Sequence, residues 1–341
     1  MESPLGTQAP RIRFSSEGLS SWMQEEALTL FVSTYQHDCL IVLSASGSDE
    51  LRITGYPFDR PMGMTLSLTS FRIATRQHIW EFENLNPIET SSRSPGDSIY
   101  RLDRVTPTGF LDAHDLAQSK DGSSILVDTH HSCLREIDSS GNAIPFWQPE
   151  FISALAAEDR CHLNGVATED GLARYATVVS DSDNEEGWRE NRRNGGQLID
   201  VENNRVVAGN LSMPHSPRLY RDRIWVLNAG TGEFGFVDPA QGGFHSIAFC
   251  PGFLRGLAFH EDYAIIGLSQ ARHNGKFSGL ELGESLDQRS ESAICGLMVV
   301  NIETHKICHS LEFDAPIAEL FDVQAVTHIG HPTLLKCQTL E

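Results

Sequence analysis

Short apolar runs separated by polar turns recur along the chain, and the clearest example lies at 210–235. A polar entry at His215 and Ser216 leads into an apolar run, and Arg221 and Asp222 then form a polar break. A second apolar run at 224–227, a glycine-rich turn and a third run at 234–237 follow. Strands this short, with turn signals between them, indicate one antiparallel sheet unit.

The same unit recurs at a nearly regular spacing. Its opening tetrapeptides begin at residues separated by 51, 50, 52, 39 and 67 positions. The six starting residues are Gly63, His114, Asn164, Ser216, Arg255 and Asp322. The last gap is long because the polar stretch 273–293 lies within it, as an insertion in a unit of ordinary length would. Four short strands in about 40–50 residues are typical of a β-propeller blade.

We therefore predict an all-β fold, a six-bladed β-propeller, because single blades bury their faces only by stacking around an axis. Strands expected at 28–34, 39–43 and 51–54 follow no start of this type. We expect them to complete the sheet begun by 322–325 and 333–336, so that both chain ends close the ring. Seven blades are the alternative, if the N-terminal strands form their own sheet. The predicted organisation is a tail or short helix at 1–26 and a single domain at 27–341.

The charge and composition of the chain disfavour several classes of function. The formal net charge of −20 disfavours binding to nucleic acid or to an anionic membrane surface, since both need a basic surface. No stretch approaches the roughly 18 apolar residues of a membrane span, and the first residues lack the order of a signal peptide. The seven cysteines are scattered without a C-x-x-C pair, as reduced thiols are. We expect a cytoplasmic protein.

Candidate chemistry gathers where the innermost strands begin. The ring arrangement brings His114, His162 and His215, from three consecutive blades, toward one opening of the channel. Converging imidazoles suit a divalent metal ion, and the sequence does not distinguish Zn, Fe or Ca. An acid/base site without metal, using His114 or His162, is the equal alternative. No nucleotide cofactor is expected, because the glycine-rich 228–233 joins two strands and opens no helix.

Further polar residues are expected around these histidines. A long charged loop at 181–196 carries a tryptophan and predicts a lid, and 273–293 is a comparable excursion. The candidate catalytic residues are His114, His162, His215, Asp322, Arg255 and Glu190. The candidate substrate-binding residues are Asn164, Arg218, Trp188, Arg189, Asn228 and Gln324. An ion pair between Arg255 and Asp322, with no role beyond structure, is the simpler interpretation of those two charges.

Long strings in the chain resemble an uncharacterised bacterial family of conserved hypothetical proteins, a domain of unknown function of β-propeller type. They are DRCHLNGVA, GWREN, LSMPHSPRLY, IWVLNAGTGEFGFVD, PGFLRGLAF, CGLMVVNIET and ELFDVQAV. The resemblance implies the fold over roughly residues 28–338 and no activity. It includes most of the candidates above, together with Ser216. His130 and His131 depart from the family pattern.

Two classes of function fit these features. The first is an enzyme that acts on a small polar metabolite or a peptide side chain at the channel mouth, as a metal-assisted hydrolase, lyase or cyclase. The second is a non-catalytic module that binds a protein partner through one face. An interaction face needs aromatic and apolar anchors, whereas His, Asp, Asn and Arg are expected at the openings. The sequence favours the enzyme and gives neither its substrate nor its oligomeric state.

Overall fold

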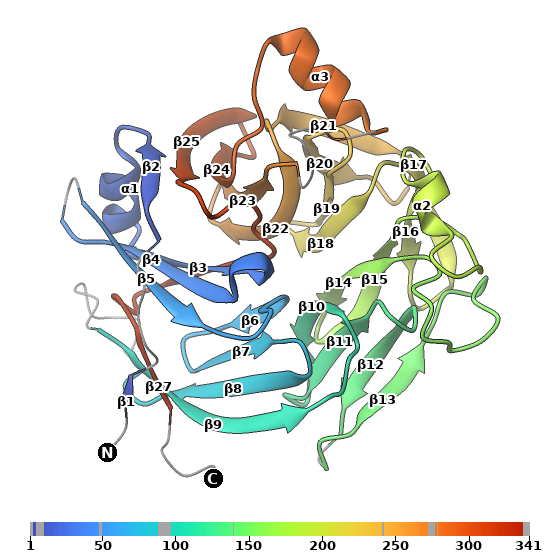
Figure 1. Cartoon of the computed structure of the whole chain (residues 1–341), viewed down its shortest axis with the longest axis horizontal. Helices are drawn as coiled ribbons and strands as arrows, with labels where there is room; N and C mark the ends of the chain where they lie inside the picture. The colour runs from blue at the N-terminus through green and yellow to red at the C-terminus, as the bar shows by residue number, and fades with distance from the viewer. Residues whose placement is uncertain are drawn as a thin grey trace.

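Six antiparallel sheets radiate around a central channel in the computed structural model (Figure 1). The structure describes residues 3–4, 10–47, 50–87, 97–138, 140–240, 242–271, 277 and 279–336. Part of the predicted excursion at 273–293 lies outside these residues. Among the described residues no helix is long and apolar enough to cross a membrane.

Each sheet contains four antiparallel strands in meander order, of which the first lies nearest the channel, and two of the sheets carry further strands at their outer edge. Blades one and two comprise β6 (Met64–Leu66), β7 (Ser70–Ala74), β8 (His78–Asn84) and β9 (Ile99–Pro107), then β10 (Ala113–Gln118), β11 (Ser124–Asp128), β12 (Cys133–Ile137) and β13 (Ala143–Trp147). Blades three and four comprise β14 (Leu163–Glu169), β15 (Leu172–Val178), β16 (Gly196–Asp200) and β17 (Arg205–Leu211), then β18 (Pro214–Tyr220), β19 (Arg223–Asn228), β20 (Glu233–Val237) and β21 (Phe244–Phe249).

The last two blades follow the same plan. They comprise β22 (Phe253–His260), β23 (Tyr263–Ser269), β24 (Gly296–Asn301) and β25 (Lys306–Phe313), then β26 (Val323–Thr327), β3 (Leu28–Thr34), β4 (Cys39–Ala45) and β5 (Leu51–Pro57). The innermost strands β6, β10, β14, β18, β22 and β26 contact one another in a closed ring. Four of the six predicted tetrapeptides lie within these strands, and the other two begin one residue before them, at Gly63 and Asp322. The six-bladed propeller is therefore confirmed, and the seven-bladed alternative is not observed.

Both chain ends close the ring, as predicted, since β26 pairs with β3 in one sheet. The prediction that 333–336 belongs to the same sheet is wrong. This segment forms β27 (Thr333–Lys336), which pairs in parallel with β9 of blade one. Both edges of β3 are already occupied by β26 and β4, whereas the outer edge of β9 is open to a further strand.

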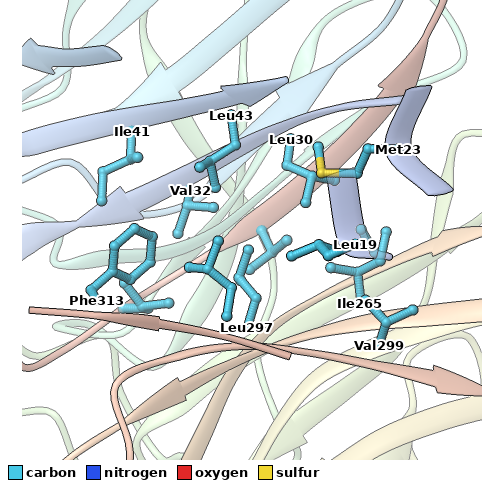
Figure 2. Packing of buried hydrophobic residues seen from close by; sticks show 14 of the residues in the cluster. Leu19, Met23, Leu30, Val32, Ile41, Leu43, Ile265, Leu297, Val299 and Phe313 are labelled. Carbon is cyan, nitrogen blue, oxygen red and sulfur yellow. The ribbon is translucent and has the colours of Figure 1, made fainter. Parts of the chain in front are cut away.

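The segment before β3 packs against the propeller. Its helix α1 (Leu19–Glu25) lies over the junction of blades five and six, and its strand β2 (Ile12–Ser15) extends blade five beyond β25. A short strand β1 (Ser3–Pro4) pairs with β27. Leu19 and Met23 of α1 lie in one buried apolar cluster with Leu30 and Leu297 (Figure 2). Burial of these side chains stabilises the contact between blade six, which closes the ring, and blade five.

Irregular backbone marks the innermost strands at one end of the channel. In blades two to five, the pairing of the innermost strand with its neighbour shifts register at or beside the predicted starts. Such bulges redirect side chains and are frequent beside functional sites. Asp112, His162 and Met213 also adopt left-handed backbone angles, with φ of 50°, 51° and 48°. This conformation is unfavourable for residues with a Cβ and clusters at functional sites.

Candidate active site at the channel mouth

This end of the channel opens into a cavity of about 810 Å³, a size that suits a small-molecule ligand. All six blades contribute to its wall. The aromatic side chains in the wall are Tyr35, Phe110, Trp188, Phe253, Phe277 and Phe321. The titratable ones are Arg60, Asp112, His114, His130, Asp159, His162, Glu186, Arg189, Arg192, Arg255 and Glu319. The cavity thus combines apolar surfaces with charges of both signs.

His162 forms a carboxylate–imidazole dyad with Asp159 in this wall. The His162 Nδ1 atom lies 3.0 Å from Asp159 Oδ2, which also accepts a hydrogen bond of 2.9 Å from Trp188 Nε1. The imidazole stacks on the Trp188 ring, with 4.2 Å between their centroids. A carboxylate can only accept in this contact, so Nδ1 carries the proton and Nε2 is the nitrogen left for a ligand. The dyad has the arrangement of a base held by an orienting carboxylate.

His114 lies beside this dyad. Its ring centroid is 4.8 Å from that of His162, and its Nδ1 donates to the backbone oxygen of Asp112 at 2.8 Å. Burial lowers the pKa of His114 to about 4, although the charge of Asp112 acts in the opposite direction. The ring is therefore neutral near pH 7, with a proton on Nδ1 and a lone pair on Nε2.

Two cations stand near these histidines. Arg60 donates to Asp112 at 2.6 Å, and its guanidinium lies 5.8 Å from the ring centre of Tyr35 and equally far from that of Phe110. Burial raises the pKa of Asp112, but the charges of His114 and Arg60 outweigh that effect and the pKa is lowered. The buried Arg255 lies over the Phe321 ring at 5.0 Å and the Phe253 ring at 5.4 Å.

Glu319 is held at the base of the same wall. Its carboxylate accepts hydrogen bonds from the Tyr35 hydroxyl and the Gln36 amide, both at 2.5 Å. Tyr35 begins η1 (Tyr35–His37), the short 3-10 helix that follows β3. The closing blade therefore contributes both polar and aromatic groups to the cavity.

Residues of both predicted excursions line the cavity. Helix α2 (Trp188–Asn191) supplies Trp188 to the wall, and α3 (Glu281–Arg289) follows Leu280, which also lines the cavity. Arg193, just after α2, pairs with Glu284 of α3 at 3.0 Å and with Glu281 at 3.5 Å. The two insertions thus meet across one side of the mouth.

Not every candidate residue lines this cavity. His215 is buried behind the wall, with Nδ1 donating to the Met213 backbone oxygen at 2.7 Å and the Phe253 ring against its edge. Burial, followed by the charge of Arg255, lowers the pKa of His215 well below 6.5. Of the three predicted histidines, His114 and His162 are therefore brought together in the wall, and His215 lies one layer deeper.

Arg218 and Gln324 lie toward the opposite end of the channel, and Asp322 contacts both of them. Arg218 donates to both oxygens of Asp115, at 2.8 and 3.1 Å, and lies 3.8 Å from Asp322. Arg218 and Gln324 line a separate cavity of about 290 Å³. The basic partner of Asp322 in this structure is thus Arg218, which also binds Asp115, and not Arg255 as the sequence suggested. Between His215 and Arg218 a bulge sets three steps of β18 against two of β19, so at about 3.3 Å per regular step the two residues are roughly 7 Å apart along the strand.

Three other candidates, Asn164, Asn228 and Glu190, are not among the residues that line the cavity. Asn228 accepts a hydrogen bond of 2.7 Å from the Ser212 backbone, and Asn164 accepts one of 2.7 Å from the Thr177 hydroxyl. Glu190 is exposed on α2, and the acidic residue that lines the cavity from this loop is Glu186, which pairs with Arg189. On the short helix α2, Trp188 is therefore buried against the cavity, whereas Glu190 faces solvent.

The chain contains functional candidates that its sequence alone did not reveal. Asp159 was missed, although it stands three residues before His162 and a D-x-x-H spacing is a readable signal. Of the two histidines that depart from the family pattern, His130 lines the cavity, whereas His131 is bound by Asp128. Arg60 lies in the loop before β6, and Tyr35 lies between β3 and β4 of the closing blade; neither position gives a comparable signal.

The described residues provide no ready metal centre. Within the ranges given above, no group of three or more His, Cys, Asp or Glu side chains is arranged to hold a metal ion.

Comparison with solved structures finds similar chains, among them one with a TM-score above 0.5, which has the same overall fold. A chain of the nidogen/laminin complex is 10% identical and aligns over 87% of this chain and 97% of its own, with a TM-score of 0.54. Virginiamycin B lyase from Staphylococcus aureus is 11% identical over 92% and 98%, with a TM-score of 0.43. A functionally unknown protein from Desulfotomaculum acetoxidans is 15% identical over 89% and 99%, with a TM-score of 0.45.

A search of curated proteins finds no match. Comparison with protein families matches residues 17–335, nearly the whole chain, which agrees with the resemblance seen in the sequence. The chain belongs to the family described as domain of unknown function DUF4915.

Proposed function

We propose that the protein is an enzyme that performs acid–base chemistry on a small polar molecule, or a peptide side chain, at the channel mouth. The observation that carries this proposal is the Asp159–His162 dyad, which lines a ligand-sized cavity with His114 beside it. A base within reach of a ligand and oriented by a carboxylate is the minimum that proton abstraction requires.

His162 is the group that moves the proton. Its Nε2 lone pair takes a proton from the substrate or from a water molecule, and Asp159 stabilises the imidazolium that forms. Stacking on Trp188 and the Trp188 hydrogen bond to Asp159 fix the ring and the carboxylate together. The rigid support makes the orientation of the base independent of the ligand.

The neighbouring groups stabilise charge. Neutral His114 presents a second lone pair beside His162, and it accepts a hydrogen bond from a ligand hydroxyl or amine. Arg255, which is buried, and Arg60, which is partly exposed, place positive charge in the cavity wall, where it stabilises negative charge that develops on the substrate. Hydrolysis, elimination and cyclisation all develop such charge, and these are the reaction classes that we assign.

A divalent metal ion at the same place is a second candidate. Its support is that His114, His162 and His215 each use Nδ1 in a hydrogen bond, which is how metal-binding histidines are oriented. The deeper position of His215 and the arrangement of the described residues do not fit it. Elemental analysis of the purified protein tests this candidate separately.

Turnover of an unselected mixture tests the proposed enzyme. The purified protein is incubated with a cell metabolite extract and a set of short peptides, and mass spectrometry follows every compound. We expect at least one compound to be consumed by the unaltered protein and by His245→Ala, which replaces an exposed histidine of β21. The His162→Ala variant should leave that compound unchanged. If no compound changes in any sample, the non-catalytic interaction module becomes the better account.

A further inference from the structure

A separate cavity of about 610 Å³, the interblade groove, lies between blades one and two. Its wall consists of Arg72, Glu81 and Arg104 of blade one and of 121–124, 136–138 and Ile144 of blade two. Its size is within the range of ligand sites, and it shares no residue with the mouth cavity. The groove is thus a surface of its own, apart from the site proposed for catalysis.

Arg72 holds the two walls of this groove together. Its guanidinium lies 3.3 Å from the carboxylate of the buried Glu81, and it donates to the Ser123 backbone oxygen and the Ser124 hydroxyl of blade two, both at 3.3 Å. Arg104 donates to the same carboxylate at 3.1 and 3.2 Å. Because these contacts form within the chain, the groove is present before any partner binds, and little ordering is needed on binding.

The two walls differ in charge. The titratable residues of blade one are two basic and one acidic, Arg72, Arg104 and Glu81. Those of blade two are all acidic, Asp121, Glu136 and Asp138. Since both arginines are bound to Glu81, the carboxylates of blade two give the groove its excess of negative charge.

Uncharged donors hold the carboxylates of blade two. Ser123 donates to Glu136 through its hydroxyl at 2.6 Å and to Asp121 through its backbone at 3.0 Å. Hydrogen bonds from Asn142 lower the pKa of Asp138, which is therefore ionised near pH 7. None of these contacts supplies a positive charge, so a basic partner can still pair with all three carboxylates.

The outer part of the groove is apolar. Ile144, which lines it, is 48% exposed, and Pro145 and Phe146 beside it on β13 are exposed as well. Within the described residues β13 is the last strand of its sheet, so its outer edge is open. A run of exposed apolar residues beside a charged groove is typical of a surface that a partner covers.

We propose that the interblade groove docks an extended basic segment of a partner protein. Its Lys or Arg side chains pair with Asp121, Glu136 and Asp138, and an apolar side chain of the segment covers Ile144. Complementary charge of this kind steers the partner and selects against acidic ones. The exposed run on β13 continues the surface beyond the groove, so an extended segment suits it better than a compact molecule. The docking site goes beyond the proposed enzyme and does not depend on it.

Fluorescence anisotropy with two labelled peptides tests this docking site. Lysine alternates with leucine in the first peptide, and glutamate alternates with leucine in the second. We expect the unaltered protein to bind the lysine peptide, more weakly at higher salt, and to leave the glutamate peptide unbound. Equal binding of the two peptides, or no binding of the lysine peptide, would overturn the proposal.

Variants separate the groove from the general acidity of the chain. Asp121→Asn combined with Glu136→Gln keeps the hydrogen-bond acceptors and removes two charges. Each exposed ion pair changes affinity by up to about fivefold, so the lysine peptide should bind about tenfold more weakly. Ile144→Ser should also weaken it. The matched control, Glu261→Gln combined with Glu303→Gln, removes two charges from turns of blade five, where these side chains are 73% and 63% exposed, and should leave the affinity unchanged. An equal loss in both double variants would show only attraction to an acidic protein and would overturn the docking site.

Hydrogen exchange of the unaltered protein locates the peptide without any substitution. The bound lysine peptide should slow amide exchange in 119–124 and in β13, and slowing confined to another part of the protein would contradict the proposal. A dimer of the unaltered protein in solution that Ile144→Ser abolishes would also contradict it, because a second copy of the chain would then cover the groove.

Discussion

Replacement of Arg218 by methionine tests the network that joins the blades along the channel. Arg218 of blade four is the counterion of Asp115 in blade two and of Asp322 in blade six. Their carboxylate side chains are only 5% and 4% exposed. Each carboxylate also accepts a backbone hydrogen bond from the next blade, at Val166 and Met64. Arg218→Met keeps an apolar chain of similar length and removes only the charge and its donors.

The expected loss of stability follows from this geometry. Removal of one partner from a buried ion pair costs about 3–5 kcal/mol, because it leaves an uncompensated charge. Two carboxylates share Arg218, so we expect the upper end, about 5 kcal/mol. Burial already raises the pKa of Asp322 to about 6, and protonation relieves the uncompensated charge. The loss should therefore be smaller at pH 5 than at pH 8.

Urea denaturation at both pH values measures this loss as a change in the free energy of unfolding. Arg221→Met is the matched control, since Arg221 also contacts three acidic residues but is 40% exposed. Exposed pairs contribute about 0–1 kcal/mol, so the control should change little. An equal effect of the two variants, or a loss from Arg218→Met that does not vary with pH, would refute the reasoning.

Three further predictions concern the site and its titration. Asp159→Asn should slow the turnover of any identified substrate by about 10²–10⁴-fold, and an unchanged rate would remove Asp159 from the mechanism. Burial holds the pKa of His114 and of His331 at about 4, below their unfolded value of 6.5. The unfolded chain therefore binds more protons between these values, and stability should fall by about 2 kcal/mol per histidine from pH 7 to pH 5. His331 lies outside the site. The His331→Gln variant should lose less stability between pH 7 and pH 5 than the unaltered protein does when both are measured by urea denaturation. An unchanged pH dependence would contradict this prediction. Near-stoichiometric metal in the purified protein, reduced in His162→Ala, would support the metal candidate, whereas a metal-free protein of full thermal stability would remove it.

The repeat made the ring predictable from the sequence. The recurring pattern of strands places the tetrapeptides in equivalent strands, and a closed propeller brings equivalent strands together regardless of their distance in the chain. His114, His162 and Arg255 were found in this way, and all three line the mouth cavity. The depth of each side chain within the channel was not predictable, because the bulges change the register locally.

The positions of several other site residues depend on local backbone geometry that the pattern of apolar and polar residues does not predict. Arg218 and Gln324 follow the predicted starts by two residues, and that distance along an extended strand moves them toward the opposite end of the channel. Asp159 reaches His162 only because both residues adopt left-handed backbone angles, with φ of 44° and 51°. The sequence does not distinguish Glu186 from Glu190, which lie in the same charged loop. The fold of this loop places Glu186 in the cavity wall.

A ligand-bound crystal structure of His162→Ala tests the central claim most directly. The variant should retain, without converting it, the compound that the unaltered protein consumes from the extract. The account predicts density for that compound in the mouth cavity, with a reacting atom within hydrogen-bond distance of the position that His162 Nε2 occupies in the unaltered protein. Density for the compound in the separate cavity that Arg218 and Gln324 line, toward the opposite end of the channel, would contradict it.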